Sequence, residues 1–449
     1  MGFLSLSFNY FWILSFLFMD GKLKEIYSYF LKSAGAVTDS RKAASGVIYF
    51  AIRGERFNGN HFAGSALKNG ALLAVVDEPG LKGRRNMIFV PDVLGTLQKL
   101  ASIHRENNPL PMIAITGSNG KTTTKELMQR VLSKRYRVHA TPGNLNNHIG
   151  LPLTILNMSD QAEMLVVEMG ANHKGEIRDL CKIADPDYGI ITNIGKAHLE
   201  GFGGYEGVIA AKSELYDHIA GKKGKVFVNI GNPLLRKLSE GIDRITYNTN
   251  GTAEVSSVLI NETPVLEAEV TWKEGKFNLK TGLYGKYNHE NVAAAVCAGL
   301  YFNVVPDSIR EAVSSYRPDN MRSQIIETGK NRIYLDAYNA NPTSMQNALE
   351  FFAGTQGSKK MLILGDMLEL GKDSRKEHKA ILNFIKNHDF DVTILIGPEF
   401  SRAAAAERCL LFTDPESASV WLDVEKPAGY DVLIKGSRGI GLEKLIGKL

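Results

Sequence analysis

The chain has 449 residues, which is more than one ordinary hydrophobic core organises, so its length indicates two or three domains. With 44% hydrophobic and 22% charged residues, the composition is that of a soluble globular protein. The net charge is only +5 and no basic block occurs, which argues against a nucleic-acid partner.

Residues 1–19 form an apolar leader in which no side chain from Gly2 to Met19 is charged. The length of this leader permits a membrane span. A signal peptide is not favoured, because no Lys or Arg precedes the apolar run and no small-x-small cleavage site follows it. The preferred interpretation is that translation begins at Met19, and a membrane tether is the alternative. Mass spectrometry of the native N-terminus distinguishes the two.

Beyond the leader, the sequence predicts an α/β protein with three domains, at residues 20–108, 109–316 and 317–449. In the first domain we expect a helix at residues 23–32. Its strands are expected at residues 47–52, 71–76 and 87–90. The stretch NNPLP at residues 107–111 predicts a linker.

The second domain alternates apolar runs with helical patterns, which indicates a parallel sheet flanked by helices. Its strands are expected at residues 112–116, 164–168, 188–193 and 225–229. Residues 253–283 show alternating strand patterns with glycine-containing turns, so a small antiparallel patch is expected there. The third domain is predicted to be a second α/β unit. Its strands are expected at residues 361–364, 392–396, 410–413 and 432–434.

A glycine-rich loop between a predicted strand and a predicted helix is the strongest single motif (IAITGSNGKTTT, residues 113–124). Gly117 and Gly120 allow backbone N–H groups to point at phosphate oxygens, and the helix N-terminus adds partial positive charge. Lys121 supplies a full charge for the β- and γ-phosphates, and the Thr122 hydroxyl can ligate Mg²⁺.

This loop is a variant of the phosphate-binding motif, because Ile115 stands where the strict pattern has its first glycine. The alternative is an ordinary glycine-rich turn with a capping threonine. The strand and helix on either side favour phosphate binding, and therefore an enzyme that uses ATP. Phosphoryl transfer alone does not identify the acceptor.

Three polar side chains downstream are candidate metal ligands. Glu168 ends a predicted parallel strand beside the phosphate loop, where a carboxylate is placed to hold a metal, although a solvated glutamate is the alternative. His198 follows another predicted strand and is either a neutral imidazole ligand or a packed loop histidine. Lys212 lies in a predicted helix, where a solvated surface lysine is the default interpretation.

Together the motifs resemble those of the Mur ligases, in the order that this family has them, from Asp20 to Leu449. The resemblance is strongest to the branch that adds D-alanyl-D-alanine to UDP-N-acetylmuramoyl-tripeptide. It implies ATP binding by Thr116, Gly117, Ser118, Asn119, Gly120, Lys121, Thr122 and Thr123. The loop PGNLNNHIGLP at residues 142–152 resembles an Asn-rich loop of that branch, and it places Asn144 and Asn147 among the substrate-binding residues.

The resemblance also implies two Mg²⁺ ions. Thr122 and Glu168 would hold one, and His198 and a carbamylated Lys212 would hold the other. This chemistry is coherent, because a lysine whose amine is neutral part of the time can add CO₂, and a metal stabilises the anion that forms.

Further motifs match the family's nucleotide site. The segment GKYNHEN (residues 285–291) resembles one that contacts adenine through its last residue, Asn291, although Tyr287 stands where the family usually has His. Arg322 matches an arginine that reaches the γ-phosphate, but Met321 replaces the usual Gly before it.

The C-terminal region carries three more motifs of the family. In DAYNANPTS (residues 336–344), Asp336 matches a ribose contact, and Tyr338 is placed in the same ATP site. GDMLELG (365–371) and KGSR (435–438) complete the match. The branch that adds diaminopimelate or lysine has Tyr-Ala-His and Gly-Asp-Arg-Asp where this chain has YNAN and GDML, which favours the dipeptide-adding branch.

In the first domain, TDSR (38–41), FAIRG (50–54) and NGNHF (58–62) resemble a uridine-diphosphate-binding domain. Ser40, Arg41 and Asn58 are therefore expected to bind substrate, whereas the turn at residues 39–41 taken alone is simply exposed. This domain argues against a folylpolyglutamate synthase. A diaminopimelate-adding ligase and a nucleotide-binding switch without ligase chemistry are the competing hypotheses.

As the resemblance implies, the terminal carboxylate of the precursor attacks the γ-phosphate of ATP, and the resulting acyl phosphate is attacked by the amine of D-alanyl-D-alanine. Lys121, His198, Lys212 and Arg322 are the expected catalytic residues. We expect a cytoplasmic monomer with small-molecule substrates and no membrane contact apart from the leader. Its three cysteines are far apart in the sequence, which favours reduced thiols.

Overall fold

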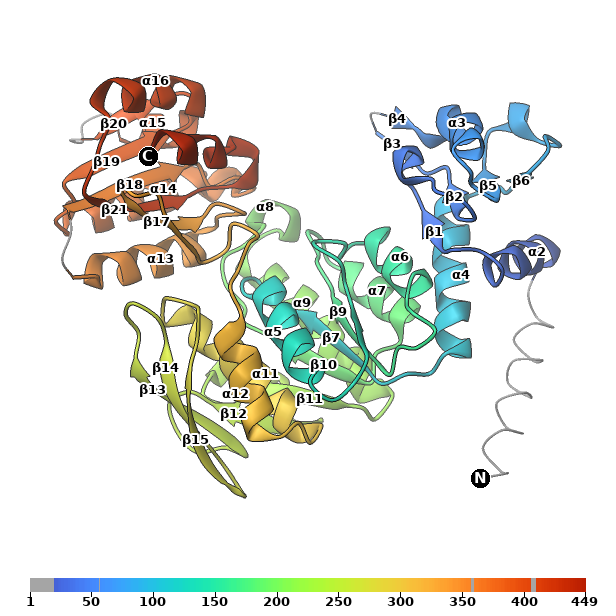
Figure 1. Ribbon diagram of the computed structural model, residues 1–449, viewed down its shortest axis with the longest axis horizontal. Coiled ribbons are helices and arrows are strands. Elements are labelled where there is room, and N and C mark those ends of the chain that lie inside the picture. Colours follow the sequence, from blue (N-terminus) through green and yellow to red (C-terminus); the bar gives the residue numbers. More distant parts are fainter. Residues whose placement is uncertain (1–19, 56, 357–358, 405–408) are drawn as a thin grey trace. The chain divides into compact units, whose positions relative to one another are not determined.

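The computed structural model describes residues 20–55, 57–356, 359–404 and 409–449 (Figure 1). The described chain is an α/β protein whose strands form sheets of four, nine and six strands and a two-stranded ribbon. The expected apolar leader, residues 1–19, lies outside the described residues. Over the part of the chain that is described, no helix has both the length and the apolar character needed to cross a membrane.

The chain divides into two compact units, each made of several segments. Within the described residues, the first unit comprises residues 20–114, 136–170 and 176–187. The second unit comprises residues 115–135, 171–175 and 188–449. Neither unit is therefore one continuous stretch of sequence.

The N-terminal sheet of the first unit has four parallel strands in the order β1-β2-β5-β6. These strands are β1 (Ala36–Val37), β2 (Ile48–Phe50), β5 (Leu73–Val76) and β6 (Met87–Phe89). Strands β3 (Arg53–Gly54) and β4 (Phe57–Asn58) form the ribbon. Helix α2 (Gly21–Phe30) begins after Asp20, whose side chain accepts a hydrogen bond from the Lys22 amide. The helix and strands expected here are confirmed, with ends that differ by a few residues.

Small side chains let helix α3 (Ala63–Lys68) lie close to this sheet. Ala63 and Ala66 are fully buried and share one hydrophobic cluster with Ala74 and Val76 of β5. Because alanine methyl groups are short, the helix backbone approaches the strands without leaving a void.

A buried arginine connects two helices of the first unit, α4 (Val93–Asn107) and α7 (Glu176–Ala184). Arg105 near the end of α4 is 5% exposed and donates hydrogen bonds to the carbonyl oxygen of Ala184 (2.9 Å) and to the Asp187 carboxylate (3.1 Å). The same Asp187 oxygen accepts the backbone N–H of Met112 at 3.0 Å. Arg105 therefore fixes the ends of both helices at the start of the strand that leads to the glycine-rich loop.

The nine-stranded sheet has the order β15-β14-β13-β12-β11-β10-β7-β9-β8. Its strands are β7 (Met112–Thr116), β8 (Val138–Ala140), β9 (Met164–Glu168), β10 (Tyr188–Ile191), β11 (Lys225–Asn229), β12 (Asp243–Asn248), β13 (Val255–Asn261), β14 (Glu267–Trp272) and β15 (Gly275–Lys280). The expected antiparallel patch is confirmed as β13–β15, and it extends the main sheet because β13 pairs in parallel with β12.

Eight helices of residues 121–315 accompany this sheet in the described chain. They are α5 (Lys121–Leu132), α6 (Gly150–Leu156), α7, α8 (Leu199–Phe202), α9 (Tyr205–Gly221), α10 (Pro233–Leu238), α11 (Tyr287–Tyr301) and α12 (Pro306–Ser315).

The C-terminal sheet, drawn in orange to red in Figure 1, has six strands in the order β16-β17-β21-β18-β19-β20. They are β16 (Gln324–Glu327), β17 (Arg332–Asp336), β18 (Lys359–Gly365), β19 (Val392–Ile396), β20 (Leu410–Phe412) and β21 (Tyr430–Lys435). Its helices are α13 (Pro342–Gly354), α14 (Ser374–Lys386), α15 (Pro398–Ala403) and α16 (Pro415–Glu425). Only β16 runs antiparallel to its neighbour among these described strands, so the expected second α/β unit is confirmed.

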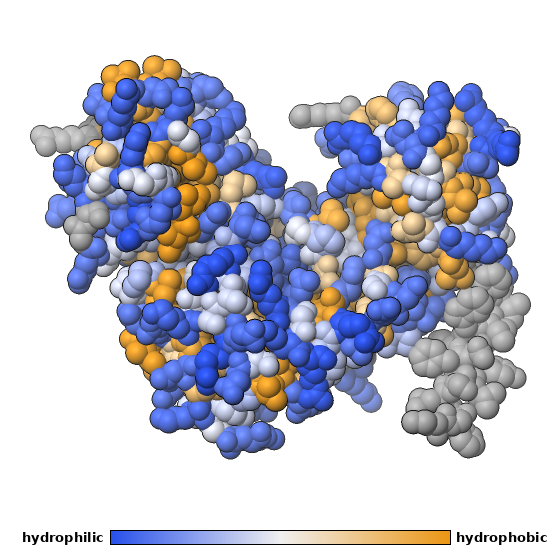
Figure 2. All heavy atoms as spheres, in the orientation of Figure 1, coloured by the Kyte–Doolittle hydropathy of each residue, from blue (hydrophilic) through white to orange (hydrophobic). Residues whose placement is uncertain are grey.

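The visible face of the molecule is mostly hydrophilic, with hydrophobic residues in scattered groups (Figure 2). Exposed apolar side chains include Val420 and Val424 of α16 and Val305 before α12. Exposed apolar residues of this kind are ordinary on a globular protein and do not by themselves indicate a partner.

The buried contacts of Arg105 predict a large effect on stability. Arg105→Met should lower the free energy of unfolding by about 3 kcal/mol, because the buried Ala184 carbonyl oxygen loses its donor and the Asp187 carboxylate loses its ion-pair partner. As the control, Lys182→Met removes an exposed partner of Asp179 from the same unit and should cost less than about 1 kcal/mol. Urea denaturation measures both variants, and equal losses would contradict the structural role of Arg105.

Candidate functional site

The glycine-rich loop joins β7 directly to α5, as the sequence predicts. Gly117 (φ +143°) and Gly120 (φ +79°) have backbone conformations that favour glycine. A Cβ atom at Gly117 would lie 2.0 Å from the Thr192 hydroxyl oxygen, and one at Gly120 would lie 2.3 Å from the Asn291 side-chain oxygen. Both positions therefore require glycine for conformational and for steric reasons.

Lys121 begins α5 and folds back over the loop, where its Nζ donates a hydrogen bond to the Gly117 carbonyl oxygen at 2.7 Å. Thr122 and Thr123 follow and are 5% and 6% exposed. The loop thus combines a helix N-terminus, a lysine and two threonines within a few residues, which is the arrangement that binds phosphate groups.

The segment after β10 supports this loop. Ser118 Oγ donates to the Gly195 carbonyl oxygen (3.0 Å), and Thr192 Oγ1 donates to the carbonyl oxygen of Asn119 (2.6 Å). Asn193 Oδ1 accepts the Asn119 N–H at 3.0 Å. Sequence reasoning did not single out Thr192 and Asn193 as loop supports. Their signal is a polar pair that directly follows a buried strand.

Asn291 of α11 is 5% exposed and contacts the phosphate-loop helix. Its Oδ1 accepts a hydrogen bond from Thr124 Oγ1 (3.1 Å), and its Nδ2 donates to Asn288 Oδ1 (3.0 Å). The side-chain amide therefore connects α11 to α5 in addition to any contact with a base.

Glu168 ends β9 and is 1% exposed. Its Oε1 accepts a hydrogen bond from Asn146 Nδ2 at 2.7 Å, whereas its Oε2 has no hydrogen-bond partner among the described residues. A buried carboxylate oxygen without a donor is costly, and a divalent cation satisfies it. Sequence reasoning quoted Asn146 within the Asn-rich loop but did not recognise it as the partner of Glu168.

His198 has a left-handed backbone conformation (φ +51°) at the start of α8, and its Nδ1 is hydrogen-bonded to the Glu369 carboxylate. This hydrogen bond lowers the pKa of Glu369. The contact also fixes the orientation of the imidazole ring, as a carboxylate does for a metal-binding histidine. Within the described residues, no group of three or more His, Cys, Asp and Glu side chains forms a metal site by itself.

Lys212 lies in α9 and is 2% exposed, so the default interpretation of a solvated surface lysine is wrong. Its Nζ donates to the Ala171 carbonyl oxygen at 3.4 Å and lies 5.1 Å from the centre of the Phe202 ring. A buried ammonium group is costly, and carbamate formation removes its positive charge.

The Arg322 guanidinium lies over the Tyr338 ring, 3.6 Å from the ring centre. Arg438 approaches the same ring at 5.1 Å. The Nε atom of Arg322 is buried and has no hydrogen-bond partner in the described part of the chain. Arg322 and Tyr338, which the sequence predicts to share the ATP site, are thus in direct contact.

Asp336 ends β17 and forms an ion pair with Lys435 of β21. The Lys435 side chain is only 1% exposed and that of Asp336 15%. The pair connects two neighbouring strands of the C-terminal sheet and fixes the direction of the Asp336 carboxylate.

The expected substrate-binding residues of the first unit lie in turns. Arg41 is exposed and bonds with Asp39 in its own turn, and the Arg41 hydrogen bond lowers the pKa of Asp39 to about 2. Ser40 is the first residue of a short 3-10 helix, Ser40–Lys42, which also contains Arg41. Asn58 Nδ2 donates to Glu78 at 3.3 Å.

In the Asn-rich loop, Asn147 Oδ1 accepts the backbone N–H groups of Ile149 (3.1 Å) and Gly150 (2.9 Å) at the start of α6. The Asn144 carbonyl oxygen accepts the N–H of Asn146 at 2.8 Å. These contacts give the loop a defined shape, and they leave the side chain of Asn144 exposed.

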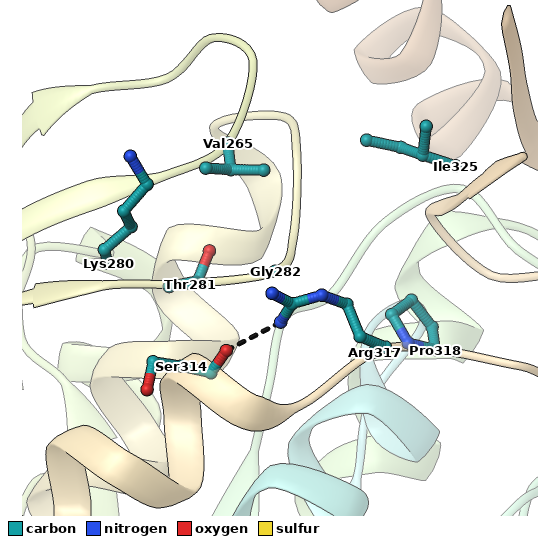
Figure 3. Close-up of a pocket in the computed structure, with 8 residues that line it drawn as sticks. All are labelled: Val265, Lys280, Thr281, Gly282, Ser314, Arg317, Pro318 and Ile325. Carbon is teal, nitrogen blue, oxygen red and sulfur yellow. Dashed lines mark hydrogen bonds between the residues drawn. The ribbon is translucent and has the colours of Figure 1, made fainter. Parts of the chain in front are cut away.

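A pocket of about 400 Å³ lies near the end of α12 (Figure 3). Arg317 points into it and donates a hydrogen bond to the Ser314 carbonyl oxygen at 2.6 Å. The other lining residues are Val265, Lys280, Thr281, Gly282, Pro318 and Ile325. No residue predicted for the site lines this pocket, so it carries no part of the candidate chemistry.

Three family models match the chain. They are the Mur ligase middle domain (residues 115–299), the Mur ligase glutamate ligase domain (321–438) and the Mur ligase family catalytic domain (34–130).

Two curated relatives carry the name UDP-N-acetylmuramoyl-tripeptide–D-alanyl-D-alanine ligase. The one from Bacillus subtilis is 34% identical over 433 residues, which cover 92% of this chain and 93% of the relative. The one from Escherichia coli is 30% identical, with 92% of both chains covered.

Two solved structures are similar along most of the chain. MurF from Acinetobacter baumannii has a TM-score of 0.84 at 31% identity, with 92% of both chains covered. The MurF ligase from Thermotoga maritima in complex with ADP has a TM-score of 0.82 at 29% identity, with 96% of this chain and 98% of that chain covered.

The ion pair of Lys435 predicts a further effect on stability. Lys435→Met should lower the free energy of unfolding by about 3 kcal/mol, since it leaves the largely buried Asp336 carboxylate unpaired. Lys444→Met, which removes an exposed partner of Glu416, is the control and should cost less than about 1 kcal/mol. Chemical denaturation of the two variants tests this difference, and a loss for Lys435→Met no larger than the control's would refute it.

Proposed function

This chain belongs to the Mur ligase family, and we propose that it is the ligase that joins D-alanyl-D-alanine to UDP-N-acetylmuramoyl-tripeptide with the use of ATP. The main support for this function is a relative of that name, which is 34% identical to this chain. The alignment covers 92% of the chain, so the similarity includes the glycine-rich loop and the regions on either side of it. The product is the pentapeptide precursor of peptidoglycan, with ADP and phosphate.

The reaction begins when the terminal carboxylate of the tripeptide attacks the γ-phosphate of ATP, which forms an acyl phosphate and releases ADP. The amine of D-alanyl-D-alanine then attacks the acyl carbon, and phosphate leaves from the tetrahedral intermediate. The main obstacle is electrostatic, because a carboxylate must approach a polyanion. The backbone N–H groups of the glycine-rich loop, Lys121 and Arg322 offset this repulsion at the phosphates.

Four residues are assigned to hold two Mg²⁺ ions, which would neutralise phosphate charge when bound. The unpartnered Oε2 of Glu168 and the hydroxyl of Thr122 are suitable oxygen ligands. His198 has a ring orientation held by Glu369, and Lys212 is buried as a carbamate site requires. Since Mg²⁺ keeps several water and phosphate ligands, it does not need a cluster of protein carboxylates.

The remaining site residues are assigned to substrate recognition. Asn291, Asp336 and Tyr338 are assigned to the adenosine part of ATP, and Ser118, Asn119 and Thr123 to its phosphates. Ser40, Arg41 and Asn58 are assigned to the UDP-linked substrate, with Asn144 and Asn147 as further substrate contacts. The exposed Arg41 guanidinium is suited to an anionic group.

The three domains are assigned to residues 20–108, 109–316 and 317–449. This division is supported by the sheets, whose strands fall at residues 36–89, 112–280 and 324–435. A cytoplasmic monomer is the proposed state. Reduced side chains at Cys181, Cys297 and Cys409 agree with a reducing compartment.

A coupled phosphate-release assay tests the function. Phosphate release should require ATP, the UDP-linked tripeptide and D-alanyl-D-alanine together, and Lys121→Ala should lower it at least about 100-fold because a full charge at the phosphates is lost. Lys134→Ala, a substitution just beyond the same helix that breaks a surface pair with Glu311, should retain activity. Phosphate release that does not depend on D-alanyl-D-alanine would contradict the ligase assignment.

Lys212→Ala should reduce kcat, because the carbamate ligand is lost, and added formate or acetate should restore part of the rate by supplying a carboxylate. The same salts added to the unsubstituted enzyme serve as the control and should not activate it. A carbamate signal in ¹³C NMR after growth with ¹³C-bicarbonate provides a direct readout. Full activity after removal of bicarbonate, without that signal, would contradict the carbamate.

A further inference from the structure

Buried hydrogen bonds hold the backbone next to Arg322, and the proposed reaction does not use them. Ser323 is 4% exposed, and its Oγ accepts a hydrogen bond from Asn288 Nδ2 at 2.9 Å. The same Oγ is hydrogen-bonded to the Tyr287 hydroxyl at 3.1 Å. Tyr287 and Asn288 are the first two residues of α11, so the start of this helix holds the residue that follows Arg322.

Further hydrogen bonds connect these residues to α5, the helix that follows the glycine-rich loop. Asn288 Oδ1 accepts a hydrogen bond from Asn291 Nδ2 (3.0 Å), and Asn291 Oδ1 accepts one from Thr124 Oγ1 (3.1 Å). Asn291 also packs closely against Gly120. A continuous set of side-chain hydrogen bonds therefore connects the first turn of α5 to Ser323.

The backbone around Arg322 adopts a conformation that is costly for its residue types. Met321 (φ +59°) and Ser323 (φ +48°) both lie in the left-handed region although neither is glycine. Such backbone conformations are strained for residues other than glycine and persist where surrounding contacts hold them. The Tyr338 N–H donates to the Met321 carbonyl oxygen at 3.2 Å, which holds the segment on the other side of Arg322.

The side chain of Arg322 is confined by these neighbours. Its guanidinium lies 3.6 Å from the centre of the Tyr338 ring, which limits its rotation. Its buried Nε has no hydrogen-bond partner among the described residues. A positively charged guanidinium that is held in place is suited to an anion that arrives in one defined position.

We propose that Ser323, held by Tyr287 and Asn288, is a positioning residue that fixes Arg322 relative to the phosphate loop for its contact with the γ-phosphate. This inference rests on the role of Arg322 under the proposed function. Ser323 needs no contact with ATP for this role. It acts by maintaining the unusual backbone beside Arg322, because an error of about 1 Å in the position of a charged group can cost about 100-fold in rate. The Tyr287 hydroxyl thereby acquires a role that the family pattern, with its histidine, does not predict.

The test compares ligands with and without a γ-phosphate. Ser323→Ala should weaken binding of β,γ-methylene-ATP about tenfold and change the Kd of ADP less than about twofold, because only the former reaches Arg322. The kcat should fall, and the KM values of the UDP-linked tripeptide and D-alanyl-D-alanine should stay constant. Isothermal titration calorimetry and steady-state kinetics supply these readouts.

Ser323→Gly separates positioning from folding. Glycine adopts a φ of +48° without strain, which offsets part of the stability lost with the two buried hydrogen bonds, so this variant should fold and still lose the preference for the ATP analogue. Tyr287→Phe, which removes one hydroxyl, should shift the preference in the same direction but less. Ser315→Ala removes a local hydrogen bond in α12 and is the matched control, with unchanged binding expected.

Arg322→Ala distinguishes failure of the inference from failure of the proposed function. If Arg322→Ala binds both ligands as the unsubstituted enzyme does, the assigned role of Arg322 is wrong. If Arg322→Ala loses the preference but both Ser323 variants keep it, the positioning role is overturned. Equal weakening of both ligands in the Ser323 variants would indicate a general structural role and would also overturn it.

Discussion

The candidate site depends on how closely the backbone of the phosphate loop approaches two neighbouring side chains. The space that a Cβ would need at Gly117 is filled by Thr192, and at Gly120 by Asn291. These side chains come from the segment after β10 and from α11, so two further elements must be correctly folded before the loop has its shape. Because a loop that binds phosphate must present its N–H groups in one direction, this packing prepares the site before a ligand arrives.

The same side chains have a second function in the site. Thr192 bonds to Asn119 within the loop, and Asn291 connects α5 to the start of α11. The glycine-rich loop, helix α11 and the segment around Arg322 are thus held by shared contacts. A substitution in one of these elements is expected to alter the stability of the others, because the energies of neighbouring groups in one hydrogen-bond network are not independent.

Much of the fold could be predicted from the sequence, because the signals are local. Apolar runs such as residues 112–116 and 164–168 became strands with the expected bounds, and the glycine turn became the expected loop. The strands that were missed are β1, β3, β4, β8, β12, β16 and β17. The first four have only two or three residues each, and the other three mix polar with apolar side chains.

Site residues whose role depends on tertiary contacts were harder to predict. Lys212 looks like a surface residue of a helix, and its burial follows from packing that the local sequence does not show. Asn146 lies 22 residues before its partner Glu168, and Tyr287 lies 36 residues before Ser323. Sequence periodicity does not indicate such pairs, because they form only when segments that are distant in the sequence pack together in the fold.

The unpartnered atoms Glu168 Oε2 and Arg322 Nε have a consequence for the lifetime of the protein. In the described chain each is withdrawn from water without a compensating bond, which weakens the folded state. Any solute that satisfies them binds the native form in preference to the unfolded one and shifts the folding equilibrium by mass action. The ligands assigned to these two atoms are Mg²⁺ and the γ-phosphate of ATP, so we expect the folded protein to resist heat and proteolysis better when MgATP is present than when it is scarce.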